Sequence, residues 1–240
     1  MKTSNQGLLA ALLLLLGALT AFNLSLRAEY RRGTYKDPLR NTTALNFKDF
    51  TQINVPAASA LKVKIVAGPY GVRVSDKAAE FVKVSQQGGR LSVALAFPEE
   101  RQYLGGGDVL TISCPRLDQL SASATYSVNA KPATDRASRG GNVRVQGFRQ
   151  DSLTLRQDQG ARVELAGNQL GYLRAEAGAS AGSRSVLRIE PGNRIEAADL
   201  RMQSQSELQL EGRIGQPRYA FGDSTRASFT GSALRGLGVR

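Results

Sequence analysis

The chain has 240 residues and a formal net charge of +12, with 41% apolar and 6% aromatic side chains, one cysteine and neither histidine nor tryptophan. Without histidine the commonest general base and metal ligand are missing, and a lone cysteine excludes an intramolecular disulfide or a cysteine metal cluster. Residues 1–150 hold 20 basic and 10 acidic side chains against 12 and 10 in 151–240, and because no basic cluster interleaved with aromatics occurs, we expect no nucleic-acid partner.

The first predicted element is an apolar segment at the N-terminus. From Gly7 to Leu26 only Thr20, Asn23 and Ser25 are clearly polar. A helix of this length could just cross a bilayer, so residues 1–26 are predicted to be a transmembrane or signal segment. Cleavage signals are poor, which favours an uncleaved anchor over a cleaved signal, and both stay open.

The charges around this segment conflict with export. Arg27, Arg31, Arg32 and Lys36 follow the segment while only Lys2 precedes it, and the positive-inside tendency would then leave the large domain in the cytoplasm. Long domains override that tendency, and a β-rich, glycine-rich domain behind a leucine-rich start is typical of export. We therefore expect a membrane-anchored protein whose domain faces the periplasm or cell exterior, and a basic linker over residues 27–46.

A strand-rich domain is predicted over residues 47–240. Apolar and polar residues alternate with period two in short segments separated by turn residues. These segments are 61–65, 72–74, 82–84, 91–95 and 108–114. Long helical periodicity is absent outside the N-terminus, so the predicted class is all-β.

The second half of the chain repeats a pair of short strands joined by a small polar corner. From Leu153 the units start at residues 153, 173, 200 and 219, which are spacings of 20, 27 and 19. Stacking such units would bury one apolar face and align Leu153, Leu173, Leu200 and Tyr219 in one ladder. This arithmetic favours a right-handed parallel β-helix, or β-solenoid, over a sandwich or barrel of meandering strands. By period two, Gln209 is predicted to face outward, stacked serine, asparagine and glutamine side chains can hydrogen-bond between units, and six residues are predicted to point inward: Leu155, Val163, Leu165, Leu200, Leu208 and Leu210.

The same residues resemble a known family, the "putative auto-transporter adhesin, head GIN domain" family of bacterial envelope proteins. The likeness covers about residues 47–235 and is carried by soft strand patterns at Phe50–Val55, Leu61–Ile65, Gly89–Val93 and Val109–Leu117, and by the later units up to Gly231. The chain departs from the family where glycine-serine corners become Gln157–Gly160 and Gln203–Ser206. The resemblance implies a parallel β-helix-like domain outside the cytoplasm.

No residue set in the sequence marks a catalytic, cofactor or metal site. Cys114 lies in a predicted strand, where a buried thiol is expected. Gly105–Gly107 lack the lysine and serine or threonine of a phosphate loop. Carboxylates are the remaining candidates for catalysis, and they are Glu99, Glu100, Asp158, Glu190, Glu196 and Asp223. Separately, Tyr30 and Tyr35 could contact anionic lipid headgroups.

Two functions therefore stay open. The first is a non-catalytic, membrane-anchored envelope module that is adhesive or scaffolding and takes an acidic glycan or an envelope protein as partner. The second is a polysaccharide-active lyase or hydrolase of β-helix type, which would need paired carboxylates. Carboxylates and aromatics converging in one groove would favour the second function.

Overall fold

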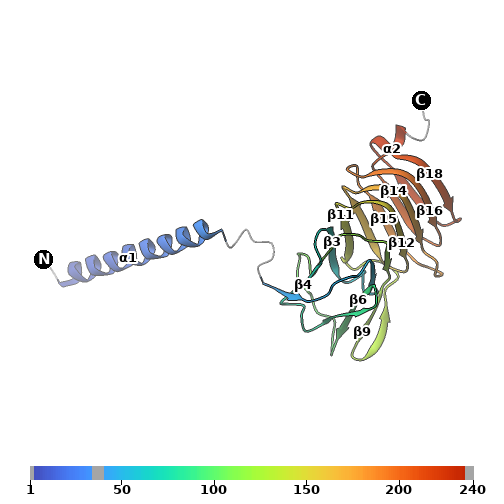
Figure 1. The fold of residues 1–240 in the computed structure, drawn as a ribbon. Coiled ribbons are helices and arrows are strands. Elements are labelled where there is room, and N and C mark those ends of the chain that lie inside the picture. Colours follow the sequence, from blue (N-terminus) through green and yellow to red (C-terminus); the bar gives the residue numbers. More distant parts are fainter. Residues whose placement is uncertain (1–2, 34–40, 236–240) are drawn as a thin grey trace. The chain divides into compact units, whose positions relative to one another are not determined.

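The computed structural model describes residues 3–33 and 41–235. The chain divides into two compact units, Met1–Thr42 and Thr43–Arg240. The first contains α1 (Thr3–Arg32) and the second contains two β-sheets (Figure 1). Residues 27–32 of the predicted linker belong to α1, whereas its residues 34–40, with Tyr35 and Lys36, lie outside the described residues.

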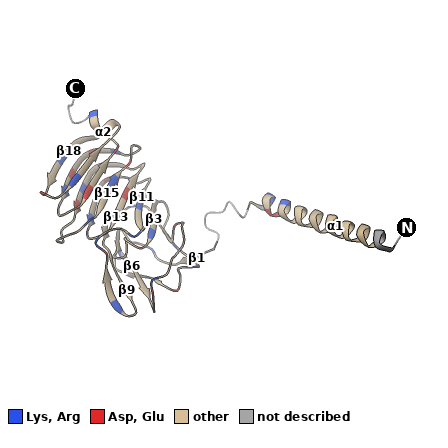
Figure 2. Ribbon diagram, turned by 180° about the vertical axis from the view of Figure 1, so that it is seen from behind, with Lys and Arg blue, Asp and Glu red and all other residues tan. Residues whose placement is uncertain are grey.

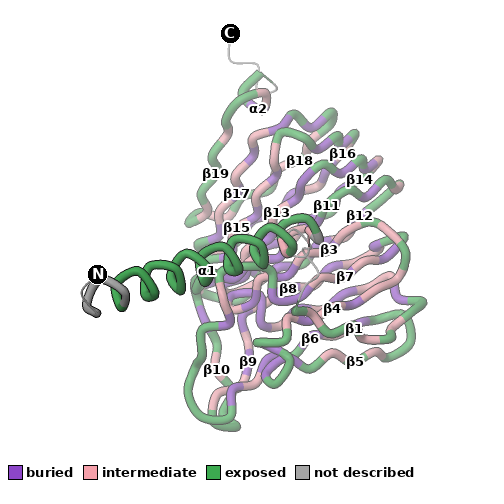
Figure 3. The backbone as a smooth tube through the Cα atoms, turned by 90° about the vertical axis from the view of Figure 1, so that its left-hand side faces the viewer, coloured by how far each residue is buried: buried purple, intermediate pink, exposed green. Residues whose placement is uncertain are grey.

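Helix α1 is apolar over most of its length, and its charged residues lie at its C-terminal end. Within residues 7–31 an 18-residue window has a mean hydropathy of 2.2 and is not buried against the rest of the chain, as the exposed colour along α1 shows (Figure 3). The helix ends where Gly33 adopts a φ of +69° and its N–H donates to the carbonyls of Glu29 and Tyr30, 3.2 Å away in each case. By length and composition α1 is able to cross a membrane, and a signal sequence has the same properties.

The first sheet of the second unit has nine strands. In spatial order they are β1 (Thr42–Leu45), β4 (Gly71–Ser75), β7 (Leu110–Cys114), β3 (Lys62–Ala67), β11 (Asn142–Gln146), β13 (Arg162–Ala166), β15 (Val186–Ile189), β17 (Glu207–Leu210) and β19 (Arg226–Phe229). Inward and outward residues alternate along most of these strands, so one face of the sheet is buried.

The second sheet has ten strands, of which all but one follow a single path. In spatial order they are β10 (Lys131–Thr134), β9 (Thr125–Val128), β6 (Arg90–Phe97), β2 (Gln52–Val55), β8 (Gln119–Ala122), β12 (Arg149–Gln157), β14 (Gln169–Ala177), β16 (Arg194–Met202) and β18 (Ile214–Phe221), with β5 (Val82–Gln87) pairing beside β6. Strands β9 and β10 form a hairpin that joins the sheet where Ala96 and Phe97 of β6 pair with Ser127 and Val128. The short helix α2 (Ser232–Arg235) follows β19.

The predicted fold class, an all-β right-handed parallel β-helix or β-solenoid, is wrong. The structure is a mixed two-sheet fold with an N-terminal helix, and its strand pairs include antiparallel ones: β4 with β7, β5 with β6 and β9 with β10. Moreover β2 lies between β6 and β8, and β3 lies between β7 and β11. Period-two alternation indicates that a segment is a strand, but it carries no information about the direction or order of pairing.

The predicted ladder is also corrected in its register. Leu153 does pair with Leu173, but Leu173 pairs with Ala198, while Leu200 pairs with Ala175 and Tyr219. The shift is two residues. Because side chains alternate with period two, a two-residue shift leaves every side chain on its predicted face.

The core lies between the two sheets. The six residues predicted to point inward are at most 2% exposed, which confirms their orientation: Leu155, Val163, Leu165, Leu200, Leu208 and Leu210.

Small polar side chains form hydrogen bonds between neighbouring turns, as expected. The side chains of Asn168 and Asn193 bond each other at 3.0 Å, and those of Ser185 and Ser206 at 2.8 Å. The corner predicted to start at Gln157 starts one residue later, because Gln157 ends β12 and is buried.

Candidate binding pocket

A pocket of about 400 Å³ opens in the second unit beside the loop that joins β6 to β7. Its wall combines that loop with the start of β3, the end of β6, strand β9 and the turn before β11. The lining side chains that matter most are Lys62, Phe97, Arg101, Tyr103, Leu104, Tyr126 and Arg139. Pockets of this size commonly bind small molecules or single units of larger ligands.

The carboxylate of Asp135 lies behind the pocket wall and is 3% exposed. Its Oδ2 accepts hydrogen bonds from the Ser59 hydroxyl at 3.0 Å and the Tyr126 hydroxyl at 2.9 Å. Its Oδ1 accepts one from Arg139 Nε at 2.7 Å and lies 3.5 Å from Arg101 Nη1. Both carboxylate oxygens are therefore occupied by donors, as a buried charge requires.

Tyr126 is held in its protonated form by this network. Burial, followed by the hydrogen bond to Asp135, raises the pKa of Tyr126 to about 12. The guanidinium of Arg101 lies over the Tyr126 ring, 5.0 Å from its centroid, which is a cation–π contact. The ring therefore positions Arg101 at the pocket, and its hydroxyl does not act as a base near neutral pH.

The loop is attached to the sheet by a lysine. Lys62 Nζ, on the first residue of β3, donates to the Gly106 carbonyl at 2.7 Å. Phe97 and Leu104 form a buried apolar floor, while Tyr103 stands at the rim with 86% of its surface exposed. A tyrosine exposed to this extent offers a flat apolar face to a ligand.

The arrangement is suited to holding an anion. Lys62, Arg101 and Arg139 bring three positive charges to the lining, and Asp135 balances one of them. Each guanidinium has five N–H donors, and the contact with Asp135 uses one donor of each arginine. The remaining donors can bind a carboxylate or sulfate, with Tyr103 beside them to stack on a sugar ring.

The acidic candidates from the sequence are not brought into this pocket's lining. Glu99 and Glu100 are exposed on the β6–β7 loop itself but do not line the pocket. Glu190 forms two hydrogen bonds with Arg144, at 2.7 and 2.8 Å, while Glu196 is exposed on β16. Among the described residues no group of three or more histidine, cysteine, aspartate or glutamate side chains could hold a metal ion.

Two further acidic candidates lie in turns. Asp223 is exposed between β18 and β19. Asp158 accepts hydrogen bonds from Ser180 and from the Gln159 N–H at 2.8 Å. Burial works to raise the pKa of Asp158, but these hydrogen bonds outweigh burial and hold the pKa below its usual value. Asp158 is thus a structural acceptor that orders the turn before β13.

The other residues singled out in the sequence are a cysteine, a glycine run and two tyrosines. Cys114 ends β7 and is buried, as predicted, and burial raises the pKa of its thiol to about 12, so it is not a ready nucleophile. Gly105–Gly107 belong to the pocket loop, where Gly105 has a φ of +106°. Tyr30 is exposed on α1, and Tyr35 lies outside the described residues.

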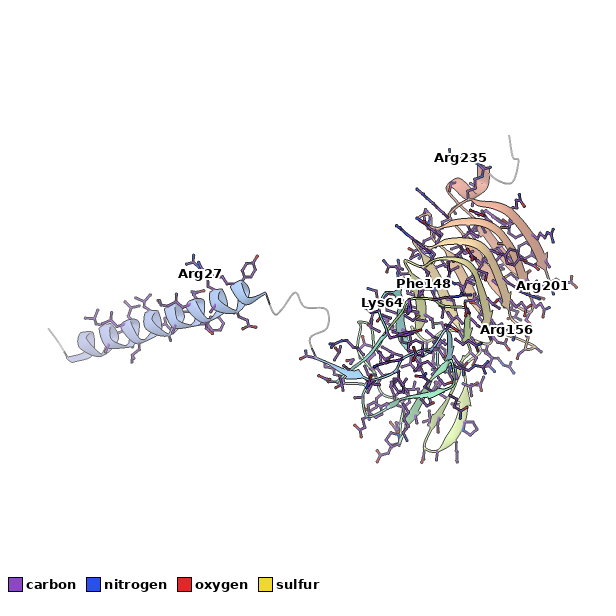
Figure 4. The ribbon with its side chains drawn as sticks, in the orientation of Figure 1. Arg27, Lys64, Phe148, Arg156, Arg201 and Arg235 are labelled. Atoms are coloured by element: carbon purple, nitrogen blue, oxygen red, sulfur yellow. The ribbon has the colours of Figure 1, made fainter. Side chains whose placement is uncertain are left out.

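Many of the basic residues lie on strands that also carry acidic residues (Figure 2). Arg144 and Arg162 contact Glu164 at 3.3 and 3.2 Å, and Arg188 contacts Glu211 at 2.7 Å. Arg156 and Arg201 project from the outer face of the second sheet (Figure 4). These pairs are partly exposed, and ion pairs at a protein surface contribute about 0–1 kcal/mol each. We therefore assign them to the surface of the sheets and not to a functional site.

Sequence reasoning does not find this pocket. Ser59 and Asp135 are 76 residues apart, with Arg101 and Tyr126 between them, and no short motif joins the four. The one local signal is the loop of residues 98–107, which is long enough to carry function.

Comparisons with known proteins show only distant likeness. No family model matches the chain, and none of the curated proteins matches it. A solved structure described as a putative adhesin from Bacteroides fragilis NCTC 9343 is 11% identical, covers 78% of this chain and 95% of its own, and has a TM-score of 0.44.

Two structures from Parabacteroides distasonis ATCC 8503 are also similar. One, a putative adhesin, is 12% identical with a TM-score of 0.38, and the other, a putative lipid binding protein, is 12% identical with a TM-score of 0.29. Each match covers 80% of this chain and 94% of the other. The resemblance to the head GIN domain family is not confirmed, and these likenesses carry no argument about function.

Proposed function

We propose that the chain is a non-catalytic interaction module of the cell envelope that binds an acidic glycan through the pocket beside the β6–β7 loop. One observation carries this proposal: Lys62, Arg101 and Arg139 line a pocket whose nearest carboxylate, Asp135, is already satisfied by four donors. A uronate or sulfate group would take the spare donors, and the exposed ring of Tyr103 would stack on the sugar.

Binding accounts for this geometry better than catalysis does. A glycosidase needs one carboxyl group that can give a proton and a second one to act as base or nucleophile. Both oxygens of Asp135 accept hydrogen bonds, and the raised pKa of Tyr126 keeps its proton in place. An enzyme acting on polysaccharide is therefore the alternative that the test must address.

The proposed location is at a membrane, with the second unit facing the periplasm or cell exterior. Helix α1 supports the anchor because it is long and apolar enough to span a bilayer. The division into an anchor over 1–26, a basic linker over 27–46 and a domain over 47–240 stays a prediction. An envelope protein remains the other candidate partner.

The test measures binding of acidic and neutral oligosaccharides by calorimetry, using residues 43–240. This part contains every residue of the hydrophobic core. We expect Arg101→Gln to weaken binding of a uronate oligosaccharide about 10-fold, the effect of losing one charged hydrogen bond. The matched control is Arg156→Gln, which removes the same charge from the outer face of β12 and should leave the affinity unchanged.

Three outcomes would contradict the proposal. Equal loss in both variants would mean that the ligand responds to net charge and not to the pocket. Steady release of new reducing or unsaturated ends, abolished by changing one aspartate or glutamate, would identify an enzyme instead. Binding of a neutral oligosaccharide with equal affinity would remove the acidic class of ligand.

A further inference from the structure

Both sheets end at the same end of the second unit, near α2 (Figure 1). Strand β18 is the last strand of the second sheet, and β19 is the last strand of the first. Their inward residues continue the rows of the core, since Tyr219 pairs with Leu200, Phe221 with Met202 and Phe229 with Leu210. The inward residues of β18 and β19 pack against the preceding strand on one side, and no strand of the described chain lies on their other side.

Aromatic side chains close the core at this end and stay partly exposed. The rings of Tyr219 and Phe221 stack at 5.6 Å, and Phe229 meets Tyr219 edge-on at 5.7 Å. Phe221 is 42% exposed, and Leu234 on α2 is 47% exposed. Exposed surface along β19 and α2 is visible in Figure 3. We call residues 213–235 the terminal surface.

The terminal surface is also basic. It carries Arg213, Arg218, Arg226 and Arg235 against a single acid, Asp223. All four arginines are exposed, and Figure 4 shows Arg235 projecting from α2. Among the described residues none of the four side chains forms an ion pair or hydrogen bond, in contrast to Arg144, Arg162 and Arg188 on earlier strands.

The position of α2 adds to the surface. Ser232 Oγ donates to the Glu211 carbonyl at 3.4 Å, which sets α2 beside the turn that leads to Arg213. On the preceding strands Asp199 and Glu207 lie in register with Arg218 and Arg226, but in the described chain neither forms an ion pair with the arginine opposite it. Asp199 instead contacts Arg201 at 3.6 Å, and Glu207 accepts a hydrogen bond from Gln209 at 2.7 Å. The four arginines and Asp223 give the terminal surface itself a formal net charge of +3.

We infer that the terminal surface docks on an anionic phospholipid surface. Its four arginines, unpaired within the described chain, match the phosphate headgroups, and the half-exposed Phe221 and Leu234 match the boundary between headgroups and acyl chains. A second copy stacked end to end would bring two sets of four arginines together, which like-charge repulsion disfavours. An acidic polysaccharide would complement the charge of the arginines but offers no apolar layer for Phe221 and Leu234.

The test uses tryptophan as a reporter, because the chain contains none. In residues 43–240, Leu234→Trp places an indole on the terminal surface and Tyr103→Trp places one at the pocket rim. Vesicles of phosphatidylcholine mixed with phosphatidylglycerol should shift the Leu234→Trp emission to the blue, and lipids brominated on the acyl chains should quench it. Vesicles of phosphatidylcholine alone should do neither, and the Tyr103→Trp emission should stay unchanged.

Charge variants test the arginines separately. Each basic residue at an anionic surface strengthens binding about fivefold, so the double variant Arg218→Ser/Arg226→Ser should weaken partitioning about 25-fold. The matched control Lys83→Ser/Lys131→Ser removes two exposed charges on β5 and β10, away from this end, and should change it little. Added salt should weaken binding of the unmodified protein.

The proposal is overturned if both double variants partition alike, or if neutral and anionic vesicles bind equally. It is also overturned if Leu234→Trp responds to an acidic polysaccharide and not to vesicles, since the occupant would then be a glycan. The glycan pocket is reported independently by Tyr103→Trp, so either proposal can fail while the other stands. Thermal unfolding of each variant establishes that a loss of binding does not reflect a loss of fold.

Discussion

The buried charge of Asp135 links three separate segments of the chain. Ser59 precedes β3, Tyr126 lies on β9 and Arg139 lies in the turn before β11, and each donates to the same carboxylate. Hydrogen bonds to a charged group contribute about 1.5–3 kcal/mol each, and removing one leaves buried charge less well satisfied. The pocket wall is therefore held in shape by electrostatics as well as by its apolar floor.

Tyr126 provides a pH test of this network. Replacing Tyr126 by Phe removes one donor to Asp135 and should lower the free energy of unfolding at neutral pH by about 1–3 kcal/mol. The pKa of an unfolded tyrosine is near 10.0, whereas the folded pKa of Tyr126 is raised to about 12. Because the folded pKa is the higher one, the stabilisation by Tyr126 is complete below about pH 10 and is lost as the pH rises through about 12.

The measurement is urea unfolding of residues 43–240 at a series of pH values up to about 12. The difference between the unmodified protein and Tyr126→Phe should shrink along the alkaline limb. Cys114, whose pKa burial raises from 9.0 to about 12, contributes equally to both proteins there and cancels in the comparison. A difference that stays constant with pH would show that the Tyr126 proton is not coupled to folding.

At the scale of the strand, side chains alternate between the buried and the solvated face, so the same substitution at two adjacent residues should change the free energy of unfolding by different amounts. Leu208 and Gln209 are adjacent on β17, yet Leu208 is fully buried and Gln209 faces outward, where its side chain bonds Glu207. Leu208 lies in register with Leu187 on one side and Ala227 on the other. A charge at position 208 would be buried among apolar side chains.

Leu208→Asp should therefore lower the free energy of unfolding by about 3–5 kcal/mol, because it buries an unpaired carboxylate. Gln209→Asp introduces the same side chain on the solvated face and should cost less than about 1 kcal/mol. Thermal or urea unfolding of both variants makes the comparison. Similar midpoints for the two would mean that the alternation on β17 is assigned to the wrong faces.

At the scale of the whole molecule, the open question is on which side of the membrane the two-sheet unit lies if α1 spans the bilayer. The charged residues of α1 are at its C-terminal end, next to the sheets in sequence (Figure 2), which opposes export by the positive-inside tendency. We expect the length of the following domain to override this bias. A reporter that is active only after export, fused after Arg240, should be active. Activity of a reporter restricted to the cytoplasm would reverse the proposed orientation.

The sequence by itself determined what depends on neighbouring residues. The apolar run from Gly7 to Leu26 specified the exposed helix, and period-two alternation specified which side chains enter the core, down to Leu208 and its outward neighbour. These properties survive a register shift of two residues, which is why the core was predicted correctly although the ladder at Leu173 was not.

Only the tertiary structure decided how the strands pair and where the sites form. The antiparallel strands β4, β5 and β10, and the insertion of β2 between β6 and β8, depend on contacts between residues far apart in the chain, which no local pattern encodes. The same holds for Asp135 and its donors, and for the terminal surface, which forms because in the described chain no strand follows β18 and β19 within their sheets. Pairing order fixes which charges meet a partner, and that order is a property of the whole fold.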